Sequence, residues 1–338
     1  MKIDFQLTDR CNLKCVHCIF GEQKKNITMS LSEIIAIIDQ LGKNKINHIH
    51  ITGGEPLLHR YFLTILWYIR KKEMEIELQT NGTLLSREII RDISGYSNIN
   101  KIYISLDGPK NVHEKIRGPG QYDKTIHSIQ NCIEYSIPIV VNTCVTKNNI
   151  YSIDELIHIL MNCKVKEINL LHYNPINWIK DSLLLSPNDW FILIQYLNEK
   201  VMHIYKDKIK IRIFSGYSKR GSKGTKFCPI KKQTNEKIFI QTDGNVYPCP
   251  LLSNKGIALG NLCSTTLKEI IKKINIYQIK QSFTCKCKYY KECMGGCIAF
   301  TNNKSDYRCS LYKNELISRK WLPSCPFVAV ELPILGGS

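Results

Sequence analysis

Hydrophobic residues in the first half of the chain follow two alternating periods. Short apolar runs predict strands at residues 2–8, 46–52, 75–80, 101–106, 137–143 and 166–173. Between them, apolar residues recur every three or four positions and predict helices at residues 31–42, 60–72, 86–93, 122–135 and 152–162. A Ser30–Glu33 pair suits a capping box at the start of the first helix. Six strand-then-helix units predict an α/β fold with a parallel sheet, open or curled into a partial (β/α)6 TIM-like barrel.

The pattern changes in the second half of the chain. A single long helix is expected over residues 186–205, followed by a Gly-, Ser- and Lys-rich segment at 216–226 that suits a surface loop or a domain boundary. Short segments with clustered cysteines then replace the strand–helix alternation. We therefore expect a core domain at 1–215, a small cysteine-rich iron–sulfur domain at 226–315 and a C-terminal tail at 316–338.

Composition narrows the class of protein. The 338 residues are 43% hydrophobic and 22% charged, as in a folded globular protein. No apolar run approaches the roughly 18–20 residues that span a bilayer, and the polar residues among the first ten exclude a signal-peptide core. These features predict a cytoplasmic protein without a membrane partner. In that compartment the 15 cysteines favour metal ligation or redox chemistry over disulfides.

The net charge of +18 changes the picture only in part. Basic residues are scattered through a chain rich in Ile, Lys and Asn, and no aromatic–basic nucleic-acid module is evident, so we expect no nucleic-acid partner. Two interpretations stay open. The charge is either a solvated basic surface or an attraction for an acidic substrate, such as a peptide segment.

Three cysteines stand close together just after the first predicted strand, in the sequence CNLKCVHC. A closed tetrahedral metal site needs four ligands, whereas three thiolates suit a 4Fe–4S cluster with one iron left for a ligand from outside the protein. The alternative is a zinc site completed by His17 or another cysteine. The active groups of parallel barrels lie at the C-terminal ends of the strands, which is where this triplet falls.

The C-x3-C-x2-C spacing of Cys11, Cys15 and Cys18 resembles the signature of the radical S-adenosylmethionine (radical SAM) superfamily. The sequence Gly53-Gly54-Glu55-Pro56 follows the second predicted strand, as the GGEP motif of that superfamily does. The resemblance implies that Gly53, Gly54 and Glu55 belong to the cosubstrate site. In the family, the backbone of this motif pairs with the methionine amino group, and glycine lets the backbone approach the ligand.

A third element resembles one branch of the superfamily. Ser105-Leu106-Asp107-Gly108 and then His113-Glu114-Lys115-Ile116-Arg117-Gly118 are similar to its SLDG and HxxxRG sequences. The resemblance implies that Ser105 and Arg117 contact the cosubstrate, with Arg117 on the methionine carboxylate. His17 matches an aromatic position that touches the adenine in relatives; an ordinary exposed histidine is the alternative. Asn81, in the turn after the third strand, is not predicted as a site residue.

The cysteines after residue 226 resemble a SPASM domain, the auxiliary-cluster extension of peptide- and protein-modifying radical SAM enzymes. The resemblance implies that Cys228, Cys249 and Cys297 hold one auxiliary cluster. It implies four ligands for a second cluster: Cys285, Cys287, Cys293 and Cys309. A pair of zinc knuckles is the alternative. Only Lys286 separates Cys285 from Cys287, where the family usually has two residues, which puts the geometry of the second cluster in doubt.

The first auxiliary cluster has only three assigned ligands. Either one of its irons is open or the cluster is completed by Cys325 or Cys263. In the formylglycine-forming branch an acid that acts as a base directly follows the glycine-linked cysteine, but Pro250 stands there in this chain. The first predicted strand begins at residue 2, so we expect no N-terminal peptide-recognition domain.

The resemblance implies a reaction and its partners. The reduced 4Fe–4S cluster cleaves S-adenosylmethionine (SAM) to a 5′-deoxyadenosyl radical, which abstracts a hydrogen from the substrate. We expect a ribosomally synthesised peptide as the substrate, modified by a cross-link, a thioether or epimerisation. An acidic leader segment of such a peptide is one candidate for the part that the enzyme binds. An electron donor such as flavodoxin or ferredoxin is implied. The alternatives are maturation of a haem-type tetrapyrrole or other cofactor, maturation of a sulfatase, and a non-catalytic iron–sulfur protein.

Overall fold

The computed structural model describes most of the first two thirds of the chain and parts of the remainder. Described are residues 1–21, 25–173, 181–197, 199, 202–205, 207–214, 217–219, 237–253, 255–280, 299, 321–323 and 330–331. The chain divides into two compact units. Unit 1 comprises Met1–Leu106, His113–Val141 and Asn235–Tyr277, and unit 2 comprises Asp107–Val112, Asn142–Thr234 and Gln278–Ser338.

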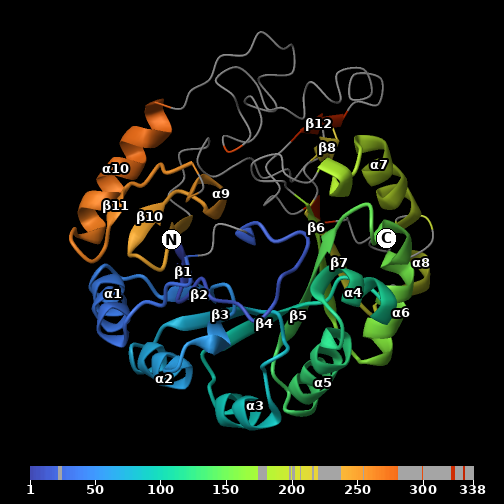
Figure 1. The fold of residues 1–338 in the computed structure, drawn as a ribbon, viewed down its shortest axis with the longest axis horizontal. Coiled ribbons are helices and arrows are strands. Elements are labelled where there is room, and N and C mark those ends of the chain that lie inside the picture. Colours follow the sequence, from blue (N-terminus) through green and yellow to red (C-terminus); the bar gives the residue numbers. More distant parts are fainter. Residues whose placement is uncertain are drawn as a thin grey trace, which may run out of the picture. The chain divides into compact units, whose positions relative to one another are not determined.

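Unit 1 is built on a largely parallel sheet (Figure 1). Its strand order is β11-β10-β9-β1-β2-β3-β4, and the neighbours from β9 to β4 are parallel. The bounds are β1 (Lys2–Gln6), β2 (His48–Thr52), β3 (Glu75–Thr80), β4 (Ile99–Ser105), β9 (Lys237–Ile240), β10 (Asn245–Tyr247) and β11 (Gly260–Asn261). β10 is antiparallel to both β9 and β11. β5 (Ile139–Val145) spans the division between the units.

Four helices of unit 1 form where the apolar period predicted them: α1 (Leu31–Lys43), α2 (Phe62–Lys71), α3 (Arg87–Ser94) and α5 (Gln121–Glu134). The C-terminal segment adds α9 (Pro250–Ser253) and α10 (Leu267–Lys280), which the strand–helix pattern did not predict. The Ser30–Glu33 capping box is present at the start of α1. One face of α1 is fully buried, through Ile34, Ile38 and Leu41. α2 contacts β3 and α5 contacts β4, so each helix buries its apolar face against a strand.

Unit 2 contains a second parallel pair, β6 (Glu167–His172) and β7 (Lys210–Phe214), with β13 (Val330–Glu331) antiparallel to β7. β8 (Tyr217–Lys219) pairs with β12 (Trp321–Pro323). Its helices are α6 (Ile153–Asn162), α7 (Pro187–Tyr196) and α8 (Met202–Tyr205). Short 3-10 turns lie at Pro56–Leu58 in unit 1 and at Ile150–Ser152 and Asp181–Leu183 in unit 2.

The predicted α/β class with parallel strand–helix units is confirmed, and one further helix was not expected. α4 (Lys110–Arg117), which begins in unit 2 and ends in unit 1, was not predicted because its apolar residues are few. Within the helix expected over residues 186–205 the structure describes α7 and α8, and residues 198, 200 and 201 between them lie outside the described residues. Most of the expected loop at 216–226 lies outside the described residues. Among the helices that the structure describes, none has the length and apolar character needed to cross a bilayer.

Candidate active site

The cysteine loop follows β1 and is held by backbone contacts on both sides. The Val16 amide donates to the Ile116 carbonyl at 3.0 Å, and the Cys18 amide donates to the Cys15 carbonyl at 3.2 Å. Leu13 is buried beneath the loop, while the three thiols of Cys11, Cys15 and Cys18 remain half-buried. The loop is therefore anchored through its backbone and the buried Leu13 side chain, which leaves the three cysteines partly exposed.

The Gly53-Gly54 turn after β2 packs directly on the backbone that leads into the cysteine loop. The Gly54 amide donates to the Thr8 carbonyl at 2.7 Å, and the Glu55 amide donates to the Arg10 carbonyl at 2.8 Å. A Cβ atom added at Gly54 would lie 2.3 Å from the Arg10 carbonyl oxygen, far inside van der Waals contact. Glycine is required here because two backbone segments meet with no room for a side chain.

Glu55 has a buried carboxyl that ties this turn to the end of β3. It accepts hydrogen bonds from the Thr80 hydroxyl at 2.8 Å, the Asn81 amide at 2.8 Å and the Leu57 amide at 3.2 Å. Burial raises the pKa of Glu55 to about 7, although these hydrogen bonds and the charge of Arg117 oppose the rise. The Glu55 side chain thus holds the turn against the end of β3. It does not line the pocket that Gly53 and Gly54 line.

One pocket of unit 1 brings together all but one of the residues predicted for the cysteine triplet and the cosubstrate site, the exception being Glu55. The predicted residues in its lining are Cys11, Cys15, His17, Cys18, Gly53, Gly54, Ser105 and Arg117. They come from four places in the sequence: the cysteine loop, the turn after β2, the end of β4 and the end of α4. The C-terminal ends of parallel strands meet at one edge of the sheet, which explains why residues about a hundred positions apart share this pocket.

Arg117 is the cation of the pocket's lining. Its Nη1 lies 3.8 Å from the Cys15 sulfur, and its Nη2 lies 3.5 Å from the Nε2 atom of His17. His17 is buried, with an exposed fraction of 9%, so it is not the ordinary exposed histidine of the alternative interpretation. A guanidinium next to an accessible pocket is suited to bind a carboxylate through two parallel hydrogen bonds.

Four polar residues of the pocket were not predicted as site residues. Thr52, Gln79, Thr80 and Asn81 all contribute to the lining. The Gln79 side-chain amide donates to the Ser105 hydroxyl at 3.2 Å, and the Asn81 side-chain amide donates to Asn12 Oδ1 at 2.9 Å and lies 3.9 Å from the Cys11 sulfur. The signal that identifies them is position, since each stands at or just after the C-terminal end of a predicted parallel strand.

The thiols suit a cluster better than a single ion. Among the residues that the structure describes, no three His, Cys, Asp or Glu side chains gather closely enough to hold one metal ion. A four-iron cluster is larger than one ion, so its thiolate ligands stand farther apart. The accessible thiols of Cys11, Cys15 and Cys18 around one pocket therefore fit a cluster with three protein ligands.

The structure covers the second cysteine field only in part. Cys249 is half-buried, directly before α9, and Cys263 is exposed. The Cys263 sulfur lies beside Gly244, whose φ is +79° in the β9–β10 turn; a Cβ there would be 2.6 Å from that sulfur. The other predicted cluster ligands lie outside the described residues: Cys228, Cys285, Cys287, Cys293, Cys297 and Cys309. The same holds for Cys325.

Two family models match the chain. Residues 5–160 match the radical SAM superfamily, and residues 228–298 match the iron–sulfur cluster-binding SPASM domain. The first range contains the whole pocket described above. The second contains β9 to β11, α9, α10 and most of the second cysteine field.

Curated relatives and solved structures are similar over nearly the whole chain. The antilisterial bacteriocin subtilosin biosynthesis protein AlbA of Bacillus subtilis is 28% identical and aligns with 92% of this chain and 71% of its own length. A cysteine-type anaerobic sulfatase-maturating enzyme of Clostridium perfringens is 26% identical, over 90% of this chain and 91% of its own. A solved structure of anSMEcpe with bound AdoMet and the Kp18Cys peptide has the same fold, with a TM-score of 0.75, 22% identity and coverage of 94% and 96%.

These matches agree with the geometry of the pocket. The fold is the partial (β/α)6 barrel of the family followed by an iron–sulfur domain. The radical SAM domain implies a 4Fe–4S cluster and SAM as cofactors, and the SPASM domain implies further iron–sulfur clusters. Membership of this family also means that the protein is an enzyme. The chain belongs to the radical SAM superfamily and carries a SPASM domain.

Proposed function

We propose that this enzyme cleaves SAM reductively to a 5′-deoxyadenosyl radical and uses it to modify a ribosomally synthesised peptide. The modification is a cross-link, a thioether or an epimerisation. The observation that carries the proposal is the pocket in which three accessible thiols face the Gly53-Gly54 backbone and Arg117. A bound 4Fe–4S cluster supplies the electron for the cleavage.

In this proposal each pocket residue has a physical task. Cys11, Cys15 and Cys18 hold the cluster and leave one iron to SAM. The Gly53-Gly54 turn presents backbone without side chains to the methionine end of SAM. Arg117 pairs with its carboxylate, and Ser105 offers a hydroxyl that is already oriented by the Gln79 amide. His17, held beside Arg117, packs near the adenine.

A peptide is favoured as the substrate for two reasons. The net charge of +18 attracts an acidic segment such as a leader peptide, and a relative similar over 92% of this chain is a bacteriocin biosynthesis protein. Sulfatase maturation is the second candidate, because a relative of that activity aligns with 90% of the chain. The residue after Cys249 argues against it, since Pro250 begins α9 and has no acid–base group.

The auxiliary cysteines and the electron supply complete the proposal. Cys228, Cys249 and Cys297 hold one auxiliary cluster, and Cys285, Cys287, Cys293 and Cys309 hold the second. The first of these either keeps an open iron or takes Cys263 or Cys325 as its fourth ligand. A flavodoxin or ferredoxin delivers the electron. The accessible Cys263 thiol is the one candidate of this pair that lies among the described residues.

The test is an anaerobic incubation of the reconstituted enzyme with SAM, a reductant and three kinds of substrate. These are candidate precursor peptides from neighbouring genes, a cysteine peptide from a sulfatase, and a haem-type tetrapyrrole. Mass spectrometry follows 5′-deoxyadenosine and each substrate. A mass change in a precursor peptide supports the proposal. If 5′-deoxyadenosine forms while only the sulfatase peptide or the tetrapyrrole changes mass, the peptide proposal is wrong.

A further inference from the structure

The two faces of the unit 1 sheet have opposite character. The face toward the helices is apolar and fully buried, through Ile3, Phe5, Ile49, Ile51, Ile76, Leu78, Ile102 and Ile104. The opposite face, here called the inner face, carries Asp4, Gln6, His48, His50, Thr52, Glu77, Gln79, Lys101, Tyr103 and Ser105. Parallel strands that are packed on both faces are usually apolar throughout. A polar inner face therefore indicates a lining for a ligand.

His50 and Asp4 form a hydrogen-bonded dyad on this face. They are register partners on β2 and β1, and His50 Nδ1 lies 2.8 Å from Asp4 Oδ1. Burial raises the pKa of Asp4, but the charges and hydrogen bonds of Lys237 and His50 outweigh it and hold that pKa at about 2. Asp4 is thus a carboxylate at neutral pH and has no hydrogen to donate. His50 therefore donates from Nδ1, and Nε2 is the ring nitrogen that is left for a further partner.

The Nε2 atom of His50 has no hydrogen-bond partner among the residues that the structure describes. The Nε2 atom itself is buried, whereas the His50 side chain as a whole is 19% exposed, so an unpartnered nitrogen lies just beneath an accessible part of the ring. Thr52, two residues further along β2 on the same face, lines the SAM pocket, which places His50 about 7 Å below that lining. Gln6, the register partner of Thr52, is 1% exposed and its Oε1 also has no partner within the described part of the chain.

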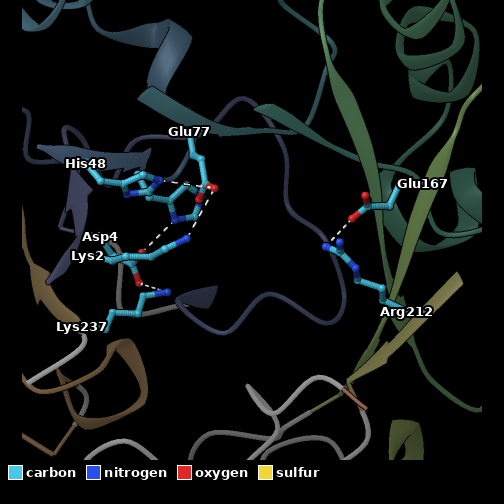
Figure 2. Close-up of polar contacts among 8 residues, drawn as sticks. Lys2, Asp4, His48, Glu77, Glu167, Arg212 and Lys237 are labelled. Atoms are coloured by element: carbon cyan, nitrogen blue, oxygen red, sulfur yellow. Dashed lines mark hydrogen bonds and ion pairs between the residues drawn. The ribbon is translucent and has the colours of Figure 1, made fainter. Parts of the chain in front are cut away.

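Charged groups surround the dyad and fix its orientation. Lys237 Nζ lies 2.7 Å from Asp4 Oδ2, while Glu77 is paired with Lys2 at 3.6 Å and with His48 at 3.4 Å; Figure 2 shows both pairings. The Tyr103 ring meets the His50 ring edge-on, with centroids 5.7 Å apart. The titratable groups that face His50 from neighbouring strands are Lys2, Asp4, Glu77, Lys101, Tyr103 and Lys237. Since Asp4 is held by Lys237 as well, the dyad is preorganised.

We infer that His50 is a catalytic residue that accepts a proton from the substrate, with Asp4 as the positioning residue that holds its tautomer. The inference rests on the proposed function and names the substrate group. Imidazole is a usual acceptor of the proton of a cysteine thiol, because a thiol, with a pKa of about 8.5, is a much stronger acid than a peptide amide or a hydroxyl. The substrate is therefore a peptide whose reacting residue includes a cysteine thiol.

The step is a proton transfer and balances without an oxidant. The S–H bond of the substrate cysteine breaks, its electron pair stays on sulfur, and the proton forms a bond to His50 Nε2. The imidazolium that results is stabilised by the Asp4 carboxylate, whose second oxygen remains on Lys237. The product is a thiolate on the inner face, close to the pocket where the radical forms.

The test compares three variants of the reconstituted holoenzyme on a cysteine-containing precursor peptide. The readout is the ratio of modified peptide to 5′-deoxyadenosine between pH 6 and pH 9. His50→Gln is expected to lower this ratio about 100-fold at pH 7, and Asp4→Asn about tenfold. At pH 9, where the substrate thiol ionises unaided, the ratio for His50→Gln is expected to recover.

His127→Gln is the matched control, because His127 is an exposed histidine of α5 that bonds the Asp123 carbonyl of its own helix and lies outside the pocket. It is expected to leave the ratio unchanged. The inference is overturned if His50→Gln retains the wild-type ratio, if its loss persists at pH 9, or if His127→Gln causes the same loss. A wild-type enzyme that cleaves SAM and modifies no peptide overturns the proposed function itself.

Discussion

Arg117 places one guanidinium beside two pocket groups, the Cys15 sulfur and the His17 ring. Replacing it with lysine keeps the charge but removes the planar fork that binds a carboxylate through two hydrogen bonds. We expect Arg117→Lys to raise the KM for SAM roughly 10- to 100-fold, as for a lost charge-assisted hydrogen bond. Initial rates of 5′-deoxyadenosine formation over a range of SAM concentrations measure this.

Arg87→Lys is the control for that experiment. Arg87 forms an exposed ion pair with Glu134 on the helices and lies outside the pocket. An exposed ion pair contributes little, and this one does not touch the pocket, so the KM for SAM is expected to stay at the wild-type value. Equal KM values for Arg117→Lys and the wild type would refute a role for Arg117 in binding the carboxylate.

Glu55 makes stability depend on pH in an unusual direction. Its pKa is about 7 in the folded protein and ordinarily 4.5, so the folded state holds the proton more tightly than the unfolded state. The stabilisation is complete below pH 4.5 and is lost as the pH rises through 7. Relative to the wild type, Glu55→Gln is therefore expected to gain up to about 3 kcal/mol in free energy of unfolding between pH 5 and pH 8.

Urea unfolding under anaerobic, reducing conditions at the two pH values measures that difference. Glu77→Gln is the matched control, because hydrogen bonding from His48 and the charge of Lys2 outweigh burial and lower the pKa of Glu77 to about 2. The stabilisation by the Glu77 carboxylate is lost only as the pH falls below 4.5. Glu77→Gln should therefore change the free energy of unfolding by the same amount at pH 5 and at pH 8. Parallel behaviour of the Glu55 and Glu77 variants would show that Glu55 is not protonated near neutrality.

At the scale of elements, the site depends on the contact between the turn after β2 and the start of the cysteine loop. Gly54→Ala would place a methyl group 2.3 Å from the Arg10 carbonyl oxygen, so one of the two backbones must move. We expect a loss of SAM cleavage of at least about 100-fold, because displacements of about 1 Å in a site have effects of that size. Single-turnover assays of 5′-deoxyadenosine measure it.

Gly95→Ala is the control, which tests whether replacing any glycine by alanine would reduce SAM cleavage. Gly95 ends α3 with φ at −80°, and a Cβ there meets nothing within 4 Å. Its activity is expected to match the wild type. If Gly54→Ala also retains activity and its iron, the close approach at Gly54 does not position the site.

The sequence predicted the elements of this site better than its side-chain partners. The strand and helix periods located β1 to β6 and five helices, because each buries a regular apolar face. α4 escaped that reasoning, since only His113 and Ile116 of its eight residues are buried. Position at the end of a predicted strand marks Gln79 and Asn81 as candidates, but no local pattern shows which residues they contact. Their role follows from the register of β3 against β4 and the fold of the cysteine loop, which only the tertiary structure supplies.

The contacts of polar residues within the strands could not be predicted from the sequence either. Asp4, His48 and His50 lie in segments that the apolar period correctly assigned as strands, yet the pattern does not show which residues meet across strands. The dyad of Asp4 and His50 depends on the pairing of β1 with β2, and its anchor depends on Lys237, more than two hundred residues away. Such contacts between distant segments are the part of the site that periodicity cannot provide.

At the scale of the whole molecule, the proposed function assigns the iron–sulfur clusters to two groups of cysteines. One group lies in the matched region 5–160, and the other lies in and just after the matched region 228–298. Three 4Fe–4S clusters would give about twelve irons per chain. We expect the triple variant Cys11→Ala, Cys15→Ala, Cys18→Ala to retain about eight irons and to lose all SAM cleavage. Cys249→Ala, by contrast, is expected to reduce the count toward eight while SAM cleavage continues, because Cys249 is not among the residues that line the SAM pocket.

Iron analysis of the anaerobically reconstituted proteins, combined with electron paramagnetic resonance of the reduced state, distinguishes these losses. Addition of SAM should change the resonance of the cluster that the triple variant lacks, because only that cluster offers an iron to SAM in the pocket. Cys132→Ala is the control, since that thiol is buried in α5, where burial raises its pKa to about 12, and it should leave both iron and spectrum unchanged. Four irons in the wild type, or twelve in the triple variant, would contradict the assignment of the two fields.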